Sequence, residues 1–219
     1  MNIGVIGSGD VGRSVAGLWL RAGHQVRFGG RRAEALAGFV GELGPHASAG
    51  TAEEAAGFGE VVFCAAPYGA WPALAPALLP HLAGKVVVDA ANPYPGRDGA
   101  FAQNAIDAGR GSGVPVAALL PGVKPVRAFN CVPWPAMVAQ AHRPGARIAV
   151  PLAGDDPAAR DVAAGLVRDA GFEPVDAGAL ARARGFDPAG PAYNRPMDAD
   201  AMRRTLGFVA PGAASTPVS

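Results

Sequence analysis

Cysteine and histidine are scarce in this sequence, with two and four residues among 219. Cys64 and Cys131 lie far apart and form no C-x-x-C motif. Cys64 stands inside an apolar strand pattern, so we expect a structural thiol in a reducing compartment. No two histidines have the H-x-x-x-H spacing of a metal-binding helix, and we predict no metal site.

An excess of charge of one sign is also absent. The formal net charge is +1, and the charged residues are spread along the chain, which argues against a nucleic-acid or anionic-membrane partner. No apolar run is long enough to span a bilayer, and no signal-peptide pattern precedes the first strand. We therefore expect a soluble, cytoplasmic protein.

Glycine and proline, by contrast, are abundant, with 31 and 21 residues. Such a composition creates chance glycine motifs, so an assignment must rest on spacing and context. Strand and helix patterns alternate along the chain, which predicts an α/β fold with a doubly wound, mostly parallel sheet. Half of the residues are apolar, enough for a substantial core.

The most informative stretch is the glycine turn Gly7-Ser8-Gly9-Asp10-Val11-Gly12. It follows an apolar strand pattern at 2–6 and opens a helix pattern that starts at Val11. In this context Gly7 permits a tight turn, Gly9 lets a pyrophosphate approach, and Gly12 lets the helix pack against the strand. The phosphates would meet free N–H groups at the positive end of the helix dipole. This pattern predicts a Rossmann-type dinucleotide site.

Two arginines, Arg31 and Arg32, follow the second predicted strand at 24–28. An Asp or Glu at this place binds the ribose 2′-hydroxyl in NAD-specific sites, but here no acid occurs before Glu34. Guanidinium groups pair with a 2′-phosphate through forked hydrogen bonds, whereas solvated cations at a helix start would oppose the helix dipole. The pair therefore favours NADP(H) over NAD(H).

Small or amide side chains end the later strands, at the sheet edge where ligands bind in open α/β folds. We assign Ala65, Ala66 and Pro67 to the ribose and nicotinamide side of the cofactor. Asn92 and Asn130 each suit either a ligand contact or a turn. Tyr68 likewise has two possible roles, stacking on a ligand ring or packing in the core.

No triad or nucleophile-elbow spacing is present, and we identify no catalytic acid or base. Hydride transfer between two bound cofactors requires none, because the protein's task is to hold two rings together. A long connection at 92–122 has the length of a lid or substrate loop.

Several motifs, in order over residues 1–184, resemble those of NADP oxidoreductases of the coenzyme F420-dependent type. The cytosolic reductase domain of six-transmembrane epithelial metalloreductases, which uses a flavin, is similar too. The motifs beyond the glycine turn are Asp89-Ala90-Ala91-Asn92-Pro93, Val126-Arg127-Ala128-Phe129-Asn130, Ala153-Gly154-Asp155-Asp156 and Gly171-Phe172-Glu173-Pro174-Val175-Asp176-Ala177-Gly178.

The resemblance implies reversible hydride transfer between NADPH and a small-molecule redox cofactor, either F420 or a flavin (FMN or FAD). It implies that residues 8–11 bind phosphate and that Arg31 and Arg32 form the 2′-phosphate pocket. Gly30 stands where the family usually has a serine, so one hydroxyl contact is missing and the extra arginine is a candidate to compensate. A homodimer is left open.

The chain divides into an NADP-binding Rossmann domain at 1–150, a C-terminal α/β extension of the same domain at 151–184, and a partly ordered Pro/Gly-rich tail at 185–219. The insertion at 94–99 and the segment after Gly185 depart from the family pattern. Both are candidates to border the pocket of the second substrate, which leaves the hydride acceptor open.

Two alternatives remain. Reductases of small imines or β-hydroxy acids share the glycine turn, but they normally carry a long C-terminal helical domain. Here only a short segment broken by prolines and glycines follows the Rossmann portion. A non-catalytic NADP-binding sensor would bind the cofactor tightly without turnover, and the sequence does not exclude it.

Overall fold

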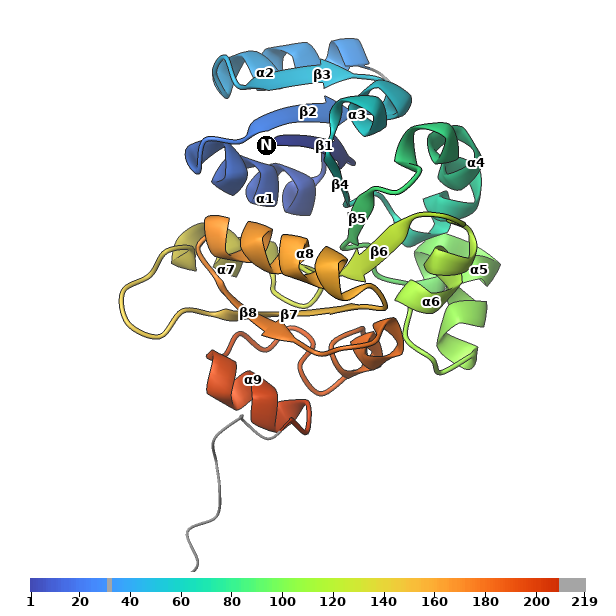
Figure 1. Ribbon diagram of the computed structural model, residues 1–219, viewed down its shortest axis with the longest axis vertical. Coiled ribbons are helices and arrows are strands. Elements are labelled where there is room, and N and C mark those ends of the chain that lie inside the picture. The colour runs from blue at the N-terminus through green and yellow to red at the C-terminus, as the bar shows by residue number, and fades with distance from the viewer. Residues whose placement is uncertain (31–32, 209–219) are drawn as a thin grey trace, which may run out of the picture.

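The computed structural model describes residues 1–30 and 33–208, in which eight strands form one sheet with helices on both faces (Figure 1). The strand order is β3-β2-β1-β4-β5-β6-β7-β8. Strands β1 to β6 are parallel, β7 is antiparallel to β6, and β8 is parallel to β7. Their bounds are β1 Asn2–Ile6, β2 Gln25–Gly29, β3 Ala47–Gly50, β4 Val61–Cys64, β5 Val86–Asp89, β6 Lys124–Arg127, β7 Ala149–Gly154 and β8 Glu173–Asp176.

This arrangement confirms the predicted Rossmann-type fold, because the first six strands have the 3-2-1-4-5-6 order of doubly wound sheets. The helices are α1 Asp10–Arg21, α2 Ala37–Glu42, α3 Ala52–Phe58, α4 Trp71–Leu82, α5 Pro95–Asp107, α6 Gly113–Ala118, α7 Trp134–Gln140, α8 Pro157–Asp169 and α9 Ala199–Thr205. Short 3₁₀ turns, η1 Ala33–Leu36, η2 Tyr68–Ala70 and η3 Leu180–Gly185, complete the described part.

Two apolar cores lie on the two faces of the sheet, because neighbouring strand residues point to opposite faces. In β4, Phe63 enters the core beneath α1 and α8, whereas Val62 and Cys64 enter the core beneath α3 and α4. Both faces of β4 are buried, which is why its sequence is a continuous apolar run.

An aromatic cluster brings together residues that lie far apart in the sequence. The Trp19 ring meets Phe63 and Phe129 edge to face, at centroid distances of 5.1 and 5.6 Å. The Trp19 indole also donates a hydrogen bond of 2.8 Å to the carbonyl of Leu166 in α8. The extension therefore shares its core with the glycine-turn helix. Our boundary at residue 150 falls within β7, which continues the same sheet.

Local capping signals identify several helix starts correctly. Thr51, with Glu54 three residues later, is the sequence pattern that predicts a capping box, and the two residues form this box at the start of α3. Asp156 caps α8, accepting a 2.9 Å hydrogen bond from the backbone of Ala159. The apolar pattern at 126–129 predicts a sixth strand there, but β6 lies at Lys124–Arg127, two residues earlier, and Phe129 turns the chain out of the sheet with a left-handed φ of 62°.

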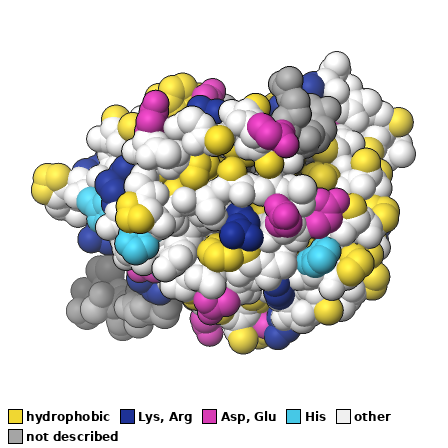
Figure 2. Space-filling model, turned by 90° about the horizontal axis from the view of Figure 1, so that it is seen from above, with side chains coloured by type: hydrophobic (Ala, Val, Ile, Leu, Met, Phe, Trp, Pro, Cys, Tyr) yellow, Lys and Arg dark blue, Asp and Glu magenta, His cyan; other side chains and the backbone are white. Residues whose placement is uncertain are grey.

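The carboxyl ends of β1, β4, β5 and β6 meet at one edge of the sheet, where a doubly wound fold binds its ligands. On the face of the molecule shown in Figure 2, cationic and anionic side chains of the described residues are interspersed. Among residues 1–30 and 33–208, no helix combines the length and the apolar composition that a membrane span needs.

Candidate active site

The glycine turn has the geometry that its sequence predicts. Gly7 has a φ of +101°, and a Cβ there would overlap the backbone of Ala65 and Ala66. A Cβ on Gly12 would overlap the carbonyl oxygen of Gly7. Gly9 is different, because nothing lies within 4 Å of the place that its Cβ would take. Two glycines thus close the turn, and the third leaves space in front of it.

The start of α1 is open for an anion. Gly9 is the N-cap residue, and because glycine has no side chain, no side-chain cap occupies the first N–H groups of this 12-residue helix. Phosphate at such a position is stabilised by hydrogen bonds and by the helix dipole. Ser8, Gly9 and Val11 line the adjoining cleft, and Asp10 is exposed in the first turn.

Two hollows meet at the turn. One is a cleft of about 620 Å³ that extends from the glycine turn along the ends of β4, β5 and β6. The other, of about 530 Å³, lies between the ends of β1 and β2 and the start of α4. Gly7, Ser8, Ala66 and Pro67 line both. An extended dinucleotide with its pyrophosphate at the turn would place one half in each hollow.

The structure brings together most of the predicted site residues. Ala65, Ala66 and Pro67 line the cleft, as do Asn92 and Asn130. Gly30 lines the second hollow. Arg31 and Arg32, the predicted 2′-phosphate pair, lie outside the described residues.

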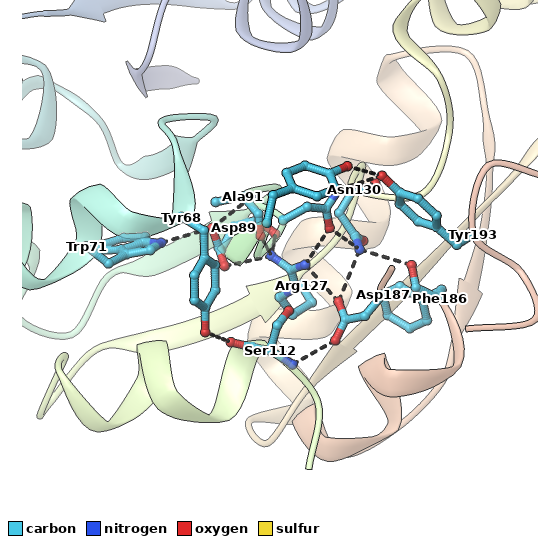
Figure 3. A network of polar contacts seen from close by, with 12 residues as sticks. Tyr68, Trp71, Asp89, Ala91, Ser112, Arg127, Asn130, Phe186, Asp187 and Tyr193 are labelled. Atoms are coloured by element: carbon cyan, nitrogen blue, oxygen red, sulfur yellow. Dashed lines mark hydrogen bonds and ion pairs between the residues drawn. The ribbon is translucent and has the colours of Figure 1, made fainter. Parts of the chain in front are cut away.

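A buried guanidinium lies directly beneath the cleft. The side chain of Arg127, at the end of β6, is 0 % exposed. It donates to the carboxylates of Asp89 and Asp187 at 2.8 Å each, and also to the Ala91 carbonyl and to Asn92 Oδ1 (Figure 3). Burial disfavours the charged guanidinium, but the two carboxylates outweigh it and raise the pKa of Arg127. Burial also raises the pKa of Asp89, although Arg127 opposes the shift.

Asp187 connects this group to the C-terminal part of the chain. Its second oxygen accepts a 2.7 Å hydrogen bond from the backbone of Ser112, near the start of α6. Asn130 Nδ2 also lies within 3.2 Å of Asp187 Oδ1 and of Asn92 Oδ1. Arg127 therefore holds the end of β5, the end of β6 and the segment after η3 in one network.

Asn92 and Asn130, each of which suited a ligand contact or a turn, are hydrogen-bonded to each other. They are not local turn devices, because Asn92 Nδ2 donates to the carbonyl of Asn130 at 2.7 Å, 38 residues away. The buried Asn130 Oδ1 has no hydrogen-bond partner among the described residues. The contact of either residue with a cofactor stays a prediction.

Tyr68 has a packing role. Its side chain is fully buried, stacks on Phe101 at 5.0 Å, and donates a 2.7 Å hydrogen bond to the Ser112 carbonyl. The two thiols are also buried, and burial raises the pKa of Cys131 to about 12. Neither cysteine thus offers a thiolate near neutral pH.

Sequence reasoning missed the far wall of the cleft. This wall consists of Tyr94 and Arg97 at the start of α5, Trp134 at the start of α7, and Tyr193 after η3. Tyr94 and Trp134 are 39 % and 43 % exposed, which is unusual for large aromatic side chains. The long connection and the C-terminal segment were both candidates to border the pocket, but no local pattern singles out these side chains.

Replacement of Arg127 by methionine should lower the free energy of unfolding by about 3–5 kcal/mol, because two carboxyl groups would stay buried without their cation. Urea denaturation measures this change. Arg203→Met is the control, since Arg203 pairs with Asp200 at the surface and its loss should cost less than about 1 kcal/mol. Equal losses in the two variants would contradict the role of Arg127.

Comparison with known proteins identifies relatives of this chain. Residues 2–93 match the family described as "NADP oxidoreductase coenzyme F420-dependent". Rat metalloreductase STEAP3 is 32% identical over 182 residues, which is 83% of this chain and 35% of that protein. The chain thus spans about a third of the length of this relative.

Two solved structures are similar over nearly their whole length. A hypothetical protein from Sinorhizobium meliloti has a TM-score of 0.75 at 27% identity, covering 90% of this chain and 95% of its own. A putative F420-dependent NADP-reductase from Arthrobacter sp. FB24 has a TM-score of 0.67 at 28% identity, covering 84% and 88%. Residues 2–93 thus match the model of the NADP oxidoreductase, coenzyme F420-dependent family, and the similarity to the three proteins above extends over 83–90% of the chain.

Proposed function

We propose that this protein transfers a hydride between NADPH and a second flat redox cofactor, a deazaflavin such as F420 or a flavin. One observation carries the proposal. The cleft has two unlike walls: the glycine turn and small residues on one side, and exposed aromatic side chains on the other. Small residues admit a cofactor close to the backbone, and aromatic rings favour a flat partner.

The residues of this chain have separable tasks in that reaction. The N–H groups at the start of α1 bind the pyrophosphate, and the open side of Gly9 admits it. Ala65 and Ala66 leave room for the nicotinamide half, and the wall around Trp134 receives the second ring. Bound NADPH supplies the hydride. The protein contributes orientation and exclusion of water, which account for a large part of the rate of such a transfer.

The alternative of an imine or β-hydroxy acid reductase is less well supported. The far wall of the cleft presents exposed aromatic side chains, which suit a flat ring system better than a small imine or hydroxy acid. We propose a small-molecule redox partner, because a cleft of about 620 Å³ has the size of a small-molecule site. A sensor without turnover differs only in its kinetics.

The proposal is tested by following NADPH oxidation anaerobically with F420, FMN, FAD and riboflavin in turn. We expect turnover with at least one of these acceptors and none with a cyclic imine. Turnover with the imine alone would establish the first alternative. Tight NADPH binding without reduction of any acceptor would instead favour the non-catalytic NADP-binding sensor.

Two glycine variants separate cofactor binding from folding. Gly9→Ala should leave the free energy of unfolding within about 0.5 kcal/mol of the wild type, since its φ of −75° suits alanine and its Cβ meets nothing. It should weaken NADPH binding tenfold or more, which is about 1.4 kcal/mol. Gly12→Ala should lose both stability and binding, because its Cβ overlaps the turn. Calorimetry measures the NADPH affinity, and an unchanged affinity in Gly9→Ala would show that the pyrophosphate does not bind at this turn.

The double variant Arg31→Ala/Arg32→Ala should weaken the binding of NADPH and leave that of NADH nearly unchanged, because guanidinium groups pair with the 2′-phosphate. Titration with both cofactors measures the difference. Arg195→Ala, an exposed arginine distant in sequence, serves as the charge control. An equal loss for the two cofactors would show that the pair does not bind the 2′-phosphate.

A further inference from the structure

Two tyrosines from distant parts of the chain meet at the far wall of the cleft. Tyr94 is the N-cap residue of α5, and Tyr193 belongs to the segment after η3. Their hydroxyl groups are hydrogen-bonded to each other, and both side chains line the cleft. Figure 3 shows Tyr193 at the end of the Arg127 network that faces away from Asp89. The contact thus joins the predicted insertion to the C-terminal segment.

The surroundings of Tyr193 determine the direction of this hydrogen bond. The amide nitrogen of Asn92, which can only donate, lies 3.5 Å from the Tyr193 oxygen. The acceptor that the described residues provide for the Tyr193 proton is the Tyr94 oxygen. Burial raises the pKa of Tyr193, and its hydrogen bond to Tyr94 raises it further, as expected for a phenol that donates. Tyr193 therefore donates to Tyr94, and the proton of Tyr94 is free to point into the cleft.

Arg97 is the one charged side chain among the described residues that line the cleft. Among its described lining residues there is no Asp, Glu, His, Lys or Cys. Arg97 carries a positive charge, but it is already engaged, because its Nε and Nη2 donate to the Asp98 carboxylate at 2.9 and 2.7 Å. Its guanidinium also covers the Tyr94 ring at 4.9 Å and so helps to hold that ring in place. Ser8 lies at the other wall, in the glycine turn.

We propose that Tyr94 is a catalytic residue that donates a hydrogen bond to the acceptor ring, at the carbonyl oxygen where negative charge collects as the hydride arrives. This inference rests on the proposed function. The hydride carries two electrons from NADPH, which becomes NADP⁺, and the acceptor gains the hydride and one negative charge. A proton from solvent then completes the reduced acceptor. Tyr193 is a positioning residue that orients and polarises the Tyr94 hydroxyl.

A donor that interacts more strongly with the charged product than with the neutral acceptor lowers the barrier to transfer. In Tyr94→Phe, the rate of hydride transfer in a single turnover should fall about tenfold, less than for an oxyanion hole because the charge spreads over the ring. The KM for the acceptor should change less than about twofold, since the aromatic ring remains. FMN and F420 are the acceptors to use, with NADPH absorbance as the signal.

A double variant tests whether Tyr193 acts through Tyr94. Tyr193→Phe should lose less than Tyr94→Phe, and the double variant should lose no more than Tyr94→Phe alone, because Tyr193 acts through Tyr94. Tyr68→Phe is the matched control, as it removes a tyrosine hydroxyl that packs outside the cleft, and its transfer rate should equal that of the wild type. Losses that multiply in the double variant would overturn the assignment of Tyr193.

Binding gives a readout that does not depend on turnover. Quenching of Trp134 fluorescence, measured anaerobically, should show that Tyr94→Phe weakens binding of reduced FMN about tenfold more than binding of oxidised FMN. Equal weakening of the binding of both forms would show that the two tyrosines only line the cleft, and it would overturn the proposal. If the wild type turns over, a transfer rate in Tyr94→Phe equal to that of the wild type would overturn it as well. Absence of both turnover and acceptor binding in the wild type would instead overturn the proposed function itself.

Discussion

The buried charge of Arg127 is the constraint on which the site depends. A guanidinium with no exposed surface is stable only when its hydrogen bonds are nearly all made, and here the partners of Arg127 come from two distant parts of the chain. Asp89 ends β5, and Asp187 follows η3. Because each partner would pay a desolvation penalty without the others, the loops at the carboxyl edge and the C-terminal segment are held in one arrangement.

That arrangement explains how a short chain builds a second wall on a dinucleotide fold. The C-terminal segment is tied down by Asp187 and by the backbone of Asn194, which donates to the Cys131 carbonyl at 2.9 Å. This places Tyr193 next to Tyr94, in the lining of the cleft that the glycine turn also borders. The cleft therefore has the glycine turn on one side and aromatic rings on the other, which is the arrangement that the proposed function uses for two flat cofactors.

The fold could be predicted from the sequence, because its signals are local. The turn at Gly7, the capping box at Thr51 and the cap at Asp156 each specify a short stretch of backbone, and the structure confirms all three. The far wall could not be predicted, because it depends on the contact between Arg127 and Asp187, which are 60 positions apart in the sequence. No periodicity marks Tyr94 and Tyr193 as neighbours. The strand end at Phe129 was misplaced because its left-handed backbone is imposed by tertiary packing rather than by its residue type.

Direct contact between the nicotinamide and the acceptor ring in one cleft is the central prediction of the proposed function. The most direct measurement uses NADPH that carries deuterium at the transferring position of C4, with a 5-deazaflavin as acceptor, because the carbon that receives the hydride does not exchange with water. Mass spectrometry of the reduced acceptor should find one deuterium atom in each molecule. A product that carries hydrogen from solvent at that carbon would contradict direct transfer, and with it the side-by-side arrangement of the two rings.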